Sequence, residues 1–414
     1  MASPSIMARE DLKVLAKGVQ AVVVLTPASA SSDDATPRER AAARAVLKLV
    51  LGPENGYAAS LRPHNPVKEV AALRKANHPN IIKLLGYSYD KAAWEHIIKL
   101  PLQAVRLNDV LAKAFVADER AAKAGTQPPQ AQVSLPLFVR TAQGLLAALA
   151  HLHSIGIAHR DVKPGNIMLS WTGEPVLKDF GTAWDEAAAG DDVEPETGER
   201  RGKSKRMTTS VGTGAYRAPE LLFGPNEYDA KALDLWAAGA TLAEFFRQIG
   251  PYPVEEYSGP DSSDEDVGEA LAAVASLKIG RRPSPADTER TPLFNAQFGD
   301  LGLAASIFRV LGTPTKESWP SFDSLPDAGK MFFEERAPVP LASMLPGLED
   351  LEADVSGPIL GLLEGLVRLE AKRRTNAADA LALLDTDVLR PLAQDKAAVA
   401  YLDSLIDPEA VKFV

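Results

Sequence analysis

The chain has 414 residues, 46% of them hydrophobic and 6% aromatic, enough to bury a sizeable core and to form two lobes or domains. Its net charge of −10 leaves no broad basic surface, so we expect neither nucleic acid nor a membrane as a partner. The absence of cysteine excludes disulfides, thiolate metal sites and thiol nucleophiles. We expect a cytoplasmic or nuclear protein, or one found in both compartments.

The first hundred residues are rich in predicted strands. A single helix is predicted over residues 65–77, where Asn65 is a suitable N-cap and Pro66 suits the first turn. The β-branched runs that predict strands lie at residues 12–16, 21–26, 45–51 and 94–100.

Beyond about residue 102 the pattern changes to long helices. Residues 136–154 carry one broad apolar side, and residues 231–246 are apolar nearly all round, which indicates a buried helix. No run approaches the roughly 18 apolar residues that span a bilayer. We expect loops at 184–207 and 260–291, and an α+β protein divided into residues 1–100, 101–392 and a tail at 393–414.

A short polar run, HRDVKPGN at residues 159–166, concentrates groups suited to phosphoryl transfer. That reaction needs cations near the phosphates, oxygen ligands for a metal ion and an acceptor for the incoming hydroxyl proton. Asp161 is the candidate base and Asn166 a candidate metal ligand. A DFG triplet begins at Asp179, whose carboxylate could hold Mg²⁺ against the phosphates of ATP.

Further motifs flank this run in a fixed order. AVLK places Lys48 on the third predicted strand, Glu69 lies in the next helix, and RAPE follows at 217–220. Together with the two preceding motifs, this order resembles the eukaryotic protein kinases over nearly the whole chain. The resemblance implies a bilobal α+β fold, with a small β-rich N-lobe, a larger helical C-lobe, and ATP and Mg²⁺ as cofactors. Lys48 would clamp the phosphates and Glu69 would orient it.

The stretches TGAYRAPELLFG, ALDLWAAGATLAEFF and IFRVLGTPTKESWPSF are similar to the cyclin-dependent kinase family. Lys163 resembles the serine/threonine class, in which this lysine contacts the γ-phosphate, so protein hydroxyls are the implied substrates. In the family, Asp234 would anchor the catalytic loop and Glu220 would form an ion pair with Arg374. Both of these roles are structural.

The activation segment predicts substrate preference and regulation. Gly212 can reach positive φ without steric cost, and Arg217 would then satisfy its carbonyl, which in the family accompanies a preference for Ser/Thr-Pro. Thr208, with Thr209 close behind, lies where the family's activating threonine falls. A phosphate there could draw in Arg160; the less favoured alternative is that these hydroxyls are only solvated loop residues.

The loop that covers the phosphates departs from the family pattern. Gly18 is retained, but Ala16 and Ala21 replace the two outer glycines, and Val23 is the expected aliphatic contact to ATP. Reduced freedom in this loop could weaken ATP binding.

The segment between the lobes is the second departure. Ile98 is the candidate for the residue that guards the back of the ATP site, and Leu100 is expected in the site. Pro101 cannot donate an N–H to adenine, although a shift of one residue would place Leu102 at the donor position.

The helix at 65–77 does not match the cyclin-recognition sequence of the best-known family members, so a cyclin or other regulatory subunit is a possible partner only. Three alternatives to an active kinase of this type stay open: a pseudokinase that acts as a scaffold, a cyclin-independent kinase that activates other kinases, and a small-molecule kinase. His151 and His153 are two residues apart, which does not bring them onto one helix face, so we expect packing roles. His159 is expected in the scaffold of the catalytic loop.

Overall fold

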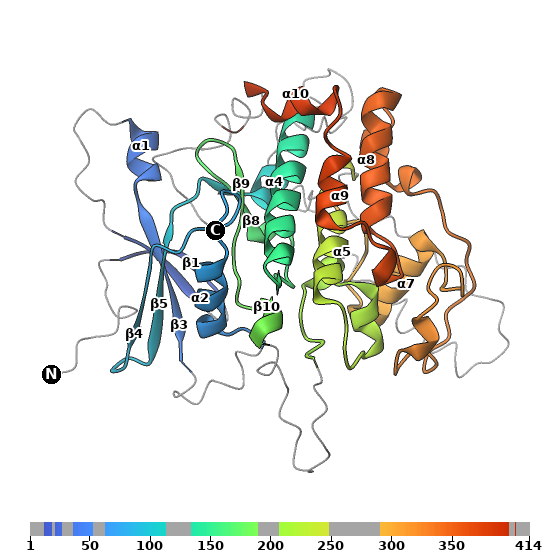
Figure 1. Cartoon of the computed structure of the whole chain (residues 1–414), viewed down its shortest axis with the longest axis horizontal. Helices are drawn as coiled ribbons and strands as arrows, with labels where there is room; N and C mark the ends of the chain where they lie inside the picture. Colours follow the sequence, from blue (N-terminus) through green and yellow to red (C-terminus); the bar gives the residue numbers. More distant parts are fainter. Residues whose placement is uncertain are drawn as a thin grey trace, which may run out of the picture.

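The computed structural model describes residues 12–18, 21–26, 36–52, 63–112, 134–188, 207–247, 290–396 and 402. They form two lobes, with a β-sheet and one long helix on the N-terminal side and a helical body on the C-terminal side (Figure 1). The predicted α+β bilobal fold is confirmed.

The small lobe is built on a five-stranded antiparallel sheet in the order β1-β2-β3-β5-β4. Sequence analysis missed β4, whose five residues are all partly exposed or exposed and so give no apolar alternation. A short helix, α1 (Pro37–Ala42), lies in the connection between β2 and β3. The strands are β1 (Lys13–Lys17), β2 (Val22–Leu25), β3 (Ala45–Leu51), β4 (Gly86–Asp90) and β5 (Glu95–Pro101).

Helix α2 (Pro66–Lys75) is the long helix of the small lobe. The predicted cap is confirmed, because the Asn65 side chain accepts hydrogen bonds from the amides of Val67 and Lys68. The face that points inward carries Val70 and Leu73, and it also carries a buried acid, Glu69. A buried carboxylate needs a charged or hydrogen-bonding partner, and this one faces the sheet.

The large lobe packs around α4 (Leu135–Ser154) and α5 (Ala230–Ala243), with α7 (Gly299–Leu311), α8 (Ala353–Leu366), α9 (Ala377–Ala382) and α10 (Leu389–Ala393) further along the chain. All but one residue of α5 are buried, as its apolar circumference predicted. In the described part of the chain, α4 alone is long and apolar enough to cross a membrane. More than half of it is buried inside the lobe, as expected for a core helix.

Short strands position the two loops that matter for the site. β6 (Val105–Arg106), β8 (Ile167–Leu169) and β9 (Pro175–Leu177) form a three-stranded sheet, while β7 (Ile157–Ala158) pairs with β10 (Trp184–Asp185). Residues 159–166 therefore run between β7 and β8, and residues 178–183 run between β9 and β10. The two polar loops lie side by side because both of their flanking strands are paired.

Several sequence-based expectations fall on residues that the structure does not describe. They include most of the predicted loops, at 189–206 and 260–289, and most of the predicted tail after residue 396. The boundaries near residues 100 and 392 stay predictions.

Candidate active site

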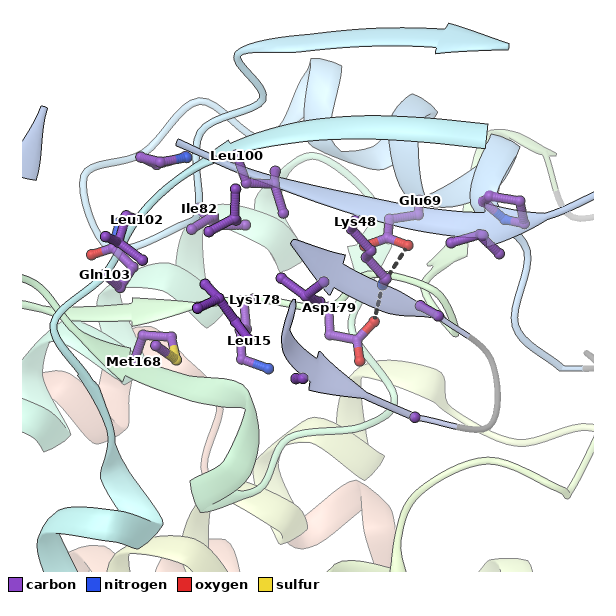
Figure 2. A pocket seen from close by; sticks show the side chains of 18 of the residues that line it. Leu15, Lys48, Glu69, Ile82, Leu100, Leu102, Gln103, Met168, Lys178 and Asp179 are labelled. Atoms are coloured by element: carbon purple, nitrogen blue, oxygen red, sulfur yellow. Dashed lines mark hydrogen bonds and ion pairs between the residues drawn. The ribbon is translucent and has the colours of Figure 1, made fainter. Parts of the chain in front are cut away.

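A cavity of about 390 Å³ lies between the lobes, within the size range of small-molecule sites (Figure 2). The small-lobe sheet and the N-terminal end of α2 form one side, and the segments around β8 and β9 form the other. Its lining residues are Leu15, Ala16, Gly18, Ala21, Val23, Val46, Lys48, Val50, His64, Asn65, Pro66, Glu69, Ile82, Leu100, Pro101, Leu102, Gln103, Arg106, Met168, Lys178 and Asp179.

Lys48 joins three elements at the inner end of the cavity. Its Nζ lies 2.8 Å from both carboxylate oxygens of Glu69 and 2.7 Å from Asp179 Oδ1. Burial alone would lower the pKa of Lys48, but the carboxylates of Asp179 and Glu69 outweigh it and raise that pKa. For Asp179, burial is likewise outweighed by Lys48 and then Lys178, which lower its pKa. At neutral pH the lysine and Asp179 are both charged.

Asp161 is the centre of a second cluster. Lys163 Nζ and Asn166 Nδ2 both lie 2.9 Å from its Oδ2, and the Thr213 hydroxyl donates to its Oδ1 at 2.6 Å. Lys163 also donates to the Thr213 hydroxyl at 2.6 Å. The structure thus brings together the three residues predicted from HRDVKPGN, and it adds Thr213, which the sequence analysis missed. The one available signal was a hydroxyl directly after Gly212.

The side chain of Asp234, in the second turn of α5, supports the backbone of the catalytic loop. Its carboxylate accepts the backbone amides of His159 at 2.8 Å and Arg160 at 2.7 Å, and it lies 2.9 Å from His153 Nε2. Arg160 has φ of 63°, a conformation that costs energy in a non-glycine residue. The paired amide bonds to a buried carboxylate offset that cost.

The catalytic loop is also tied to the DFG segment. His159 Nε2 is 2.9 Å from the Lys178 carbonyl oxygen, and the His159 and Phe180 rings meet edge to face. The Lys178 amide donates to the Asn166 carbonyl at 2.9 Å. Asp179 itself has φ of 68°, a costly conformation for a non-glycine residue, and the contacts of Lys178 and Phe180 on either side of it hold this segment against the catalytic loop. His159 therefore lies in the scaffold of the loop.

Two oxygen groups are suited to a divalent cation. Asn166 uses its Nδ2 on Asp161, which leaves the amide oxygen without a partner among the described residues. Asp179 uses only Oδ1 on Lys48. The described residues contain no cluster of three or more acidic or histidine side chains. This fits Mg²⁺, which is commonly bound by one or two protein groups while substrate phosphates and water complete the shell.

At the end of β5 and just after it, the structure differs from two of the predicted contacts to ATP. Ile98 is fully buried and is not among the residues that line the cavity, whereas Leu100, on the same face of β5, does line it. Leu102 lines the cavity, but its amide donates to the Arg44 carbonyl and its carbonyl accepts from Trp171 Nε1. Its backbone is therefore not available to a base.

The backbone amide of Gln103 is a better candidate to donate a hydrogen bond to a bound base, and sequence analysis missed this residue. It lines the cavity, and its backbone has no hydrogen-bond partner among the described residues. The Pro101 carbonyl lies on the same side of β5 as that of Lys99, which accepts from Leu85 just before β4. Pro101 can therefore serve as an acceptor, for which its missing N–H is irrelevant.

The β1–β2 hairpin forms the upper wall of the cavity. The Gly18 amide donates to the Ala21 carbonyl at 2.9 Å, which closes a tight turn. Gly18, Val23 and both alanines, Ala16 and Ala21, line the cavity. A Cβ on Gly18 would meet only the Ala21 carbonyl, at 3.6 Å, so the fold does not force glycine here.

Thr208 is buried in the described activation segment, with 6% of its surface exposed, whereas Thr209 is half-buried. The Tyr228 hydroxyl donates to the Thr208 carbonyl at 2.6 Å and accepts from Arg160 at 3.1 Å. Arg160 also donates to the Thr182 carbonyl and lies over the Trp184 ring. A phosphate on Thr208 would therefore require this packing to rearrange.

Gly212 has φ of 75°, the positive value for which glycine was expected. The predicted partner of its carbonyl is wrong in this structure. The Arg217 guanidinium donates instead to the Thr209 carbonyl at 3.1 Å and pairs with Asp300. Asp300 lies 83 residues from Arg217 in the sequence and reaches it through the start of α7, so no local pattern indicated the contact.

Glu220 and Arg374 form a bidentate ion pair with both distances at 2.7 Å. Both residues are buried, and Arg374 also donates to three backbone carbonyls and lies over the Trp236 ring. Full satisfaction of both charges explains how the pair is tolerated inside the lobe.

Three histidines and a lysine complete the description. His151 stacks on His78, in line with the predicted packing role, whereas His153 Nε2 contacts the Asp234 carboxylate and so has a polar role as well. His64 lies against Gly181, and burial lowers its pKa. Burial also lowers the pKa of Lys178, which lines the cavity and was not predicted there.

Comparison with known proteins gives consistent matches. The protein kinase domain family matches residues 54–383, a range that begins after β3 and so leaves out Gly18, Val23 and Lys48. The chain is 30% identical to cyclin-dependent kinase 20 of Pongo abelii over 56% of this chain, and the match spans about half of that relative's own length (50%).

Two further relatives are matched over more of their length. Serine/threonine-protein kinase csk1 of Schizosaccharomyces pombe is 26% identical over 69% of this chain and 72% of that protein. Cyclin-dependent kinase 7 of Carassius auratus is 27% identical over 76% of this chain and 67% of that protein.

Among solved structures, the crystal structure of the yeast RNA Pol II CTD kinase CTDK-1 complex has a TM-score of 0.52 and 20% identity, covering 84% of this chain and 86% of that one. This likeness supports the fold. The relatives confirm the predicted resemblance to cyclin-dependent kinases, and the family match over most of the chain shows that the chain belongs to the protein kinase domain family.

Proposed function

We propose that this protein is an active serine/threonine kinase that transfers the γ-phosphate of Mg-ATP to protein hydroxyls, with a preference for Ser/Thr-Pro. The observation that carries the proposal is the Asp161 cluster, in which a carboxylate, a lysine and a threonine hydroxyl meet within hydrogen-bond distance. Such a cluster can accept a hydroxyl proton and stabilise a transferred phosphoryl group.

Each side chain has a distinct task in this proposal. Asp161 receives the proton of the substrate hydroxyl, and Lys163 stabilises charge on the phosphoryl group as it moves. Lys48, held by Glu69, binds the phosphates upstream of the transferred group. Asn166 and Asp179 hold Mg²⁺, which when bound neutralises charge on the β- and γ-phosphates.

The preference for proline is supported by the positive φ of Gly212, because the turn there directs the backbone away from the residue that follows the acceptor. Protein substrates and a cyclin or other regulatory subunit are the proposed partners, and a cytoplasmic or nuclear location is proposed as well. Competing proposals are a scaffold without turnover, a cyclin-independent kinase that activates other kinases, and a small-molecule kinase.

The test is transfer of labelled phosphate from Mg-ATP to a Ser-Pro peptide and to its Ser-Ala twin, with Asp161→Asn as the control. Transfer to the Ser-Pro peptide alone, lost in the variant, is the expected result. Equal transfer to both peptides would contradict the proline preference. Transfer to a sugar instead would favour the small-molecule kinase, and neither nucleotide binding nor transfer would favour the scaffold.

A further inference from the structure

Lys178 lies in the cavity with its backbone fixed. Its amide and carbonyl are both bonded to the catalytic loop, through Asn166 and His159. Its half-buried side chain lies between Met168 and Asp179 on the large-lobe side of the cavity (Figure 2). The backbone position of Lys178 is therefore set by the same contacts that hold the catalytic loop.

The charge of Lys178 distinguishes it from the other lysine and the arginine that line the described cavity. Lys48 is paired with two carboxylates. Arg106 is paired with Asp109 through two bonds of 2.7 and 2.9 Å. Lys178 makes no ion pair or side-chain hydrogen bond with a described residue. The carboxylate of Asp179 attracts this ammonium but does not bond to it directly, so the cost of burying the charge is only partly offset, and an anion bound in the cavity would offset more of it.

The order of groups along the cavity indicates which anion would bind Lys178. Gln103 marks the end that would hold a base, Met168 lies on the floor, and Lys48 with Asp179 marks the end that would hold the outer phosphates. Lys178 lies between the floor and that outer end. We propose that Lys178 binds the α-phosphate of the nucleotide, the phosphate next to the ribose, as a point charge. This rests on the proposed function, in which the cavity binds ATP.

This contact would act together with the β1–β2 hairpin, which departs from the family's glycine pattern. Two glycines that would allow the closest backbone approach to the phosphates are alanines here, Ala16 and Ala21. Lys178 lies on the opposite wall of the cavity, from which its side chain would contact the same phosphates.

The test is calorimetric binding of ADP, AMP and adenosine to the full chain in buffer with EDTA, comparing the wild type with Lys178→Met. Loss of one charge-assisted hydrogen bond should weaken ADP and AMP by about tenfold or more, whereas adenosine should change by less than about twofold. Lys178→Arg keeps the charge and should retain most of the affinity. Lys99→Met, on an exposed position of β5, is the matched control and should bind like the wild type.

The outcomes separate the inference from the function on which it rests. If the wild type binds none of the three ligands, both are overturned. If the wild type binds ADP and Lys178→Met binds it equally well, the inference alone fails. An equal loss for adenosine would place Lys178 on the sugar or base, and a loss for ADP without one for AMP would place it on the β-phosphate; either result overturns the assignment. Thermal unfolding of each variant checks that it is folded.

Discussion

The catalytic loop and the nucleotide-facing edge of the small lobe differ in how closely they keep the family pattern. In the loop, Asp161, Lys163 and Asn166 are all retained and are held by several hydrogen bonds. At the small-lobe edge, two alanines replace glycines and Pro101 is the last residue of β5.

The difference follows from whether the side chain or the backbone of a residue makes the functional contact. In the loop, side-chain atoms make the contacts, so a substitution removes the chemistry. At the edge, the proposed contacts to a nucleotide would come from the backbone of Pro101 and Gln103, which both line the cavity, and a carbonyl is present whatever the side chain. Departures from a motif therefore weigh less against activity where the backbone makes the contact.

The largest expected effect is that of Asp161→Asn. Removal of the proton acceptor should lower kcat by about 10³-fold, within the range for general-base catalysis. ADP affinity should change little, because the carboxylate lies among catalytic-loop residues and is not among those that line the cavity. Steady-state kinetics measures the change in kcat, and calorimetry measures the change in ADP affinity. Retained turnover would remove Asp161 from the role of base and end the contrast between the two regions.

Next in size is Glu220→Gln, which leaves Arg374 buried without its carboxylate. Breaking a buried ion pair at one end should lower the free energy of unfolding by about 3 kcal/mol. Urea denaturation measures it, with exposed Glu349→Gln as the control. A loss no greater than that of the control would show that the three backbone carbonyls around Arg374 suffice.

Thr213→Val should have an intermediate effect. It removes the hydroxyl that links Lys163 to Asp161 while preserving the shape of the side chain, and kcat should fall by about tenfold, since two hydrogen bonds, each between a neutral hydroxyl and a charged group, are lost. Thr213→Ser retains the hydroxyl and should keep most of the activity. If the two variants are equally impaired, packing rather than the hydroxyl matters.

The smallest effect is expected at the small-lobe edge. The double change Ala16→Gly and Ala21→Gly restores the glycine pattern but adds backbone freedom that binding must remove, so KM for ATP should rise by no more than about threefold. A tenfold fall in KM would instead show that the two alanines impair binding, and that side chains matter in this region too.

Elements with a strong local signal were predicted well. Helix α5 was predicted because its residues are apolar all round, and the cap of α2 because Asn65 precedes Pro66. Strand β4 was missed because its partly exposed residues alternate in no clear way. The donor position was expected at Pro101 or, after a shift of one residue, at Leu102, whereas the backbone without a partner among the described residues is that of Gln103, because register depends on strand pairing rather than on the strand's own sequence.

The sequence by itself determined the fold class, the kinase resemblance and the catalytic groups in HRDVKPGN and DFG, because local periodicity and short motif spacing carry that information. Tertiary structure alone decided that Thr213 meets Asp161 across 52 residues, that Arg217 turns to Asp300, and that Lys178 lines the cavity without a direct ion pair to a described residue. Such contacts depend on how separate elements pack, and the direction of a side chain into a shared cavity is fixed only when both walls are in place.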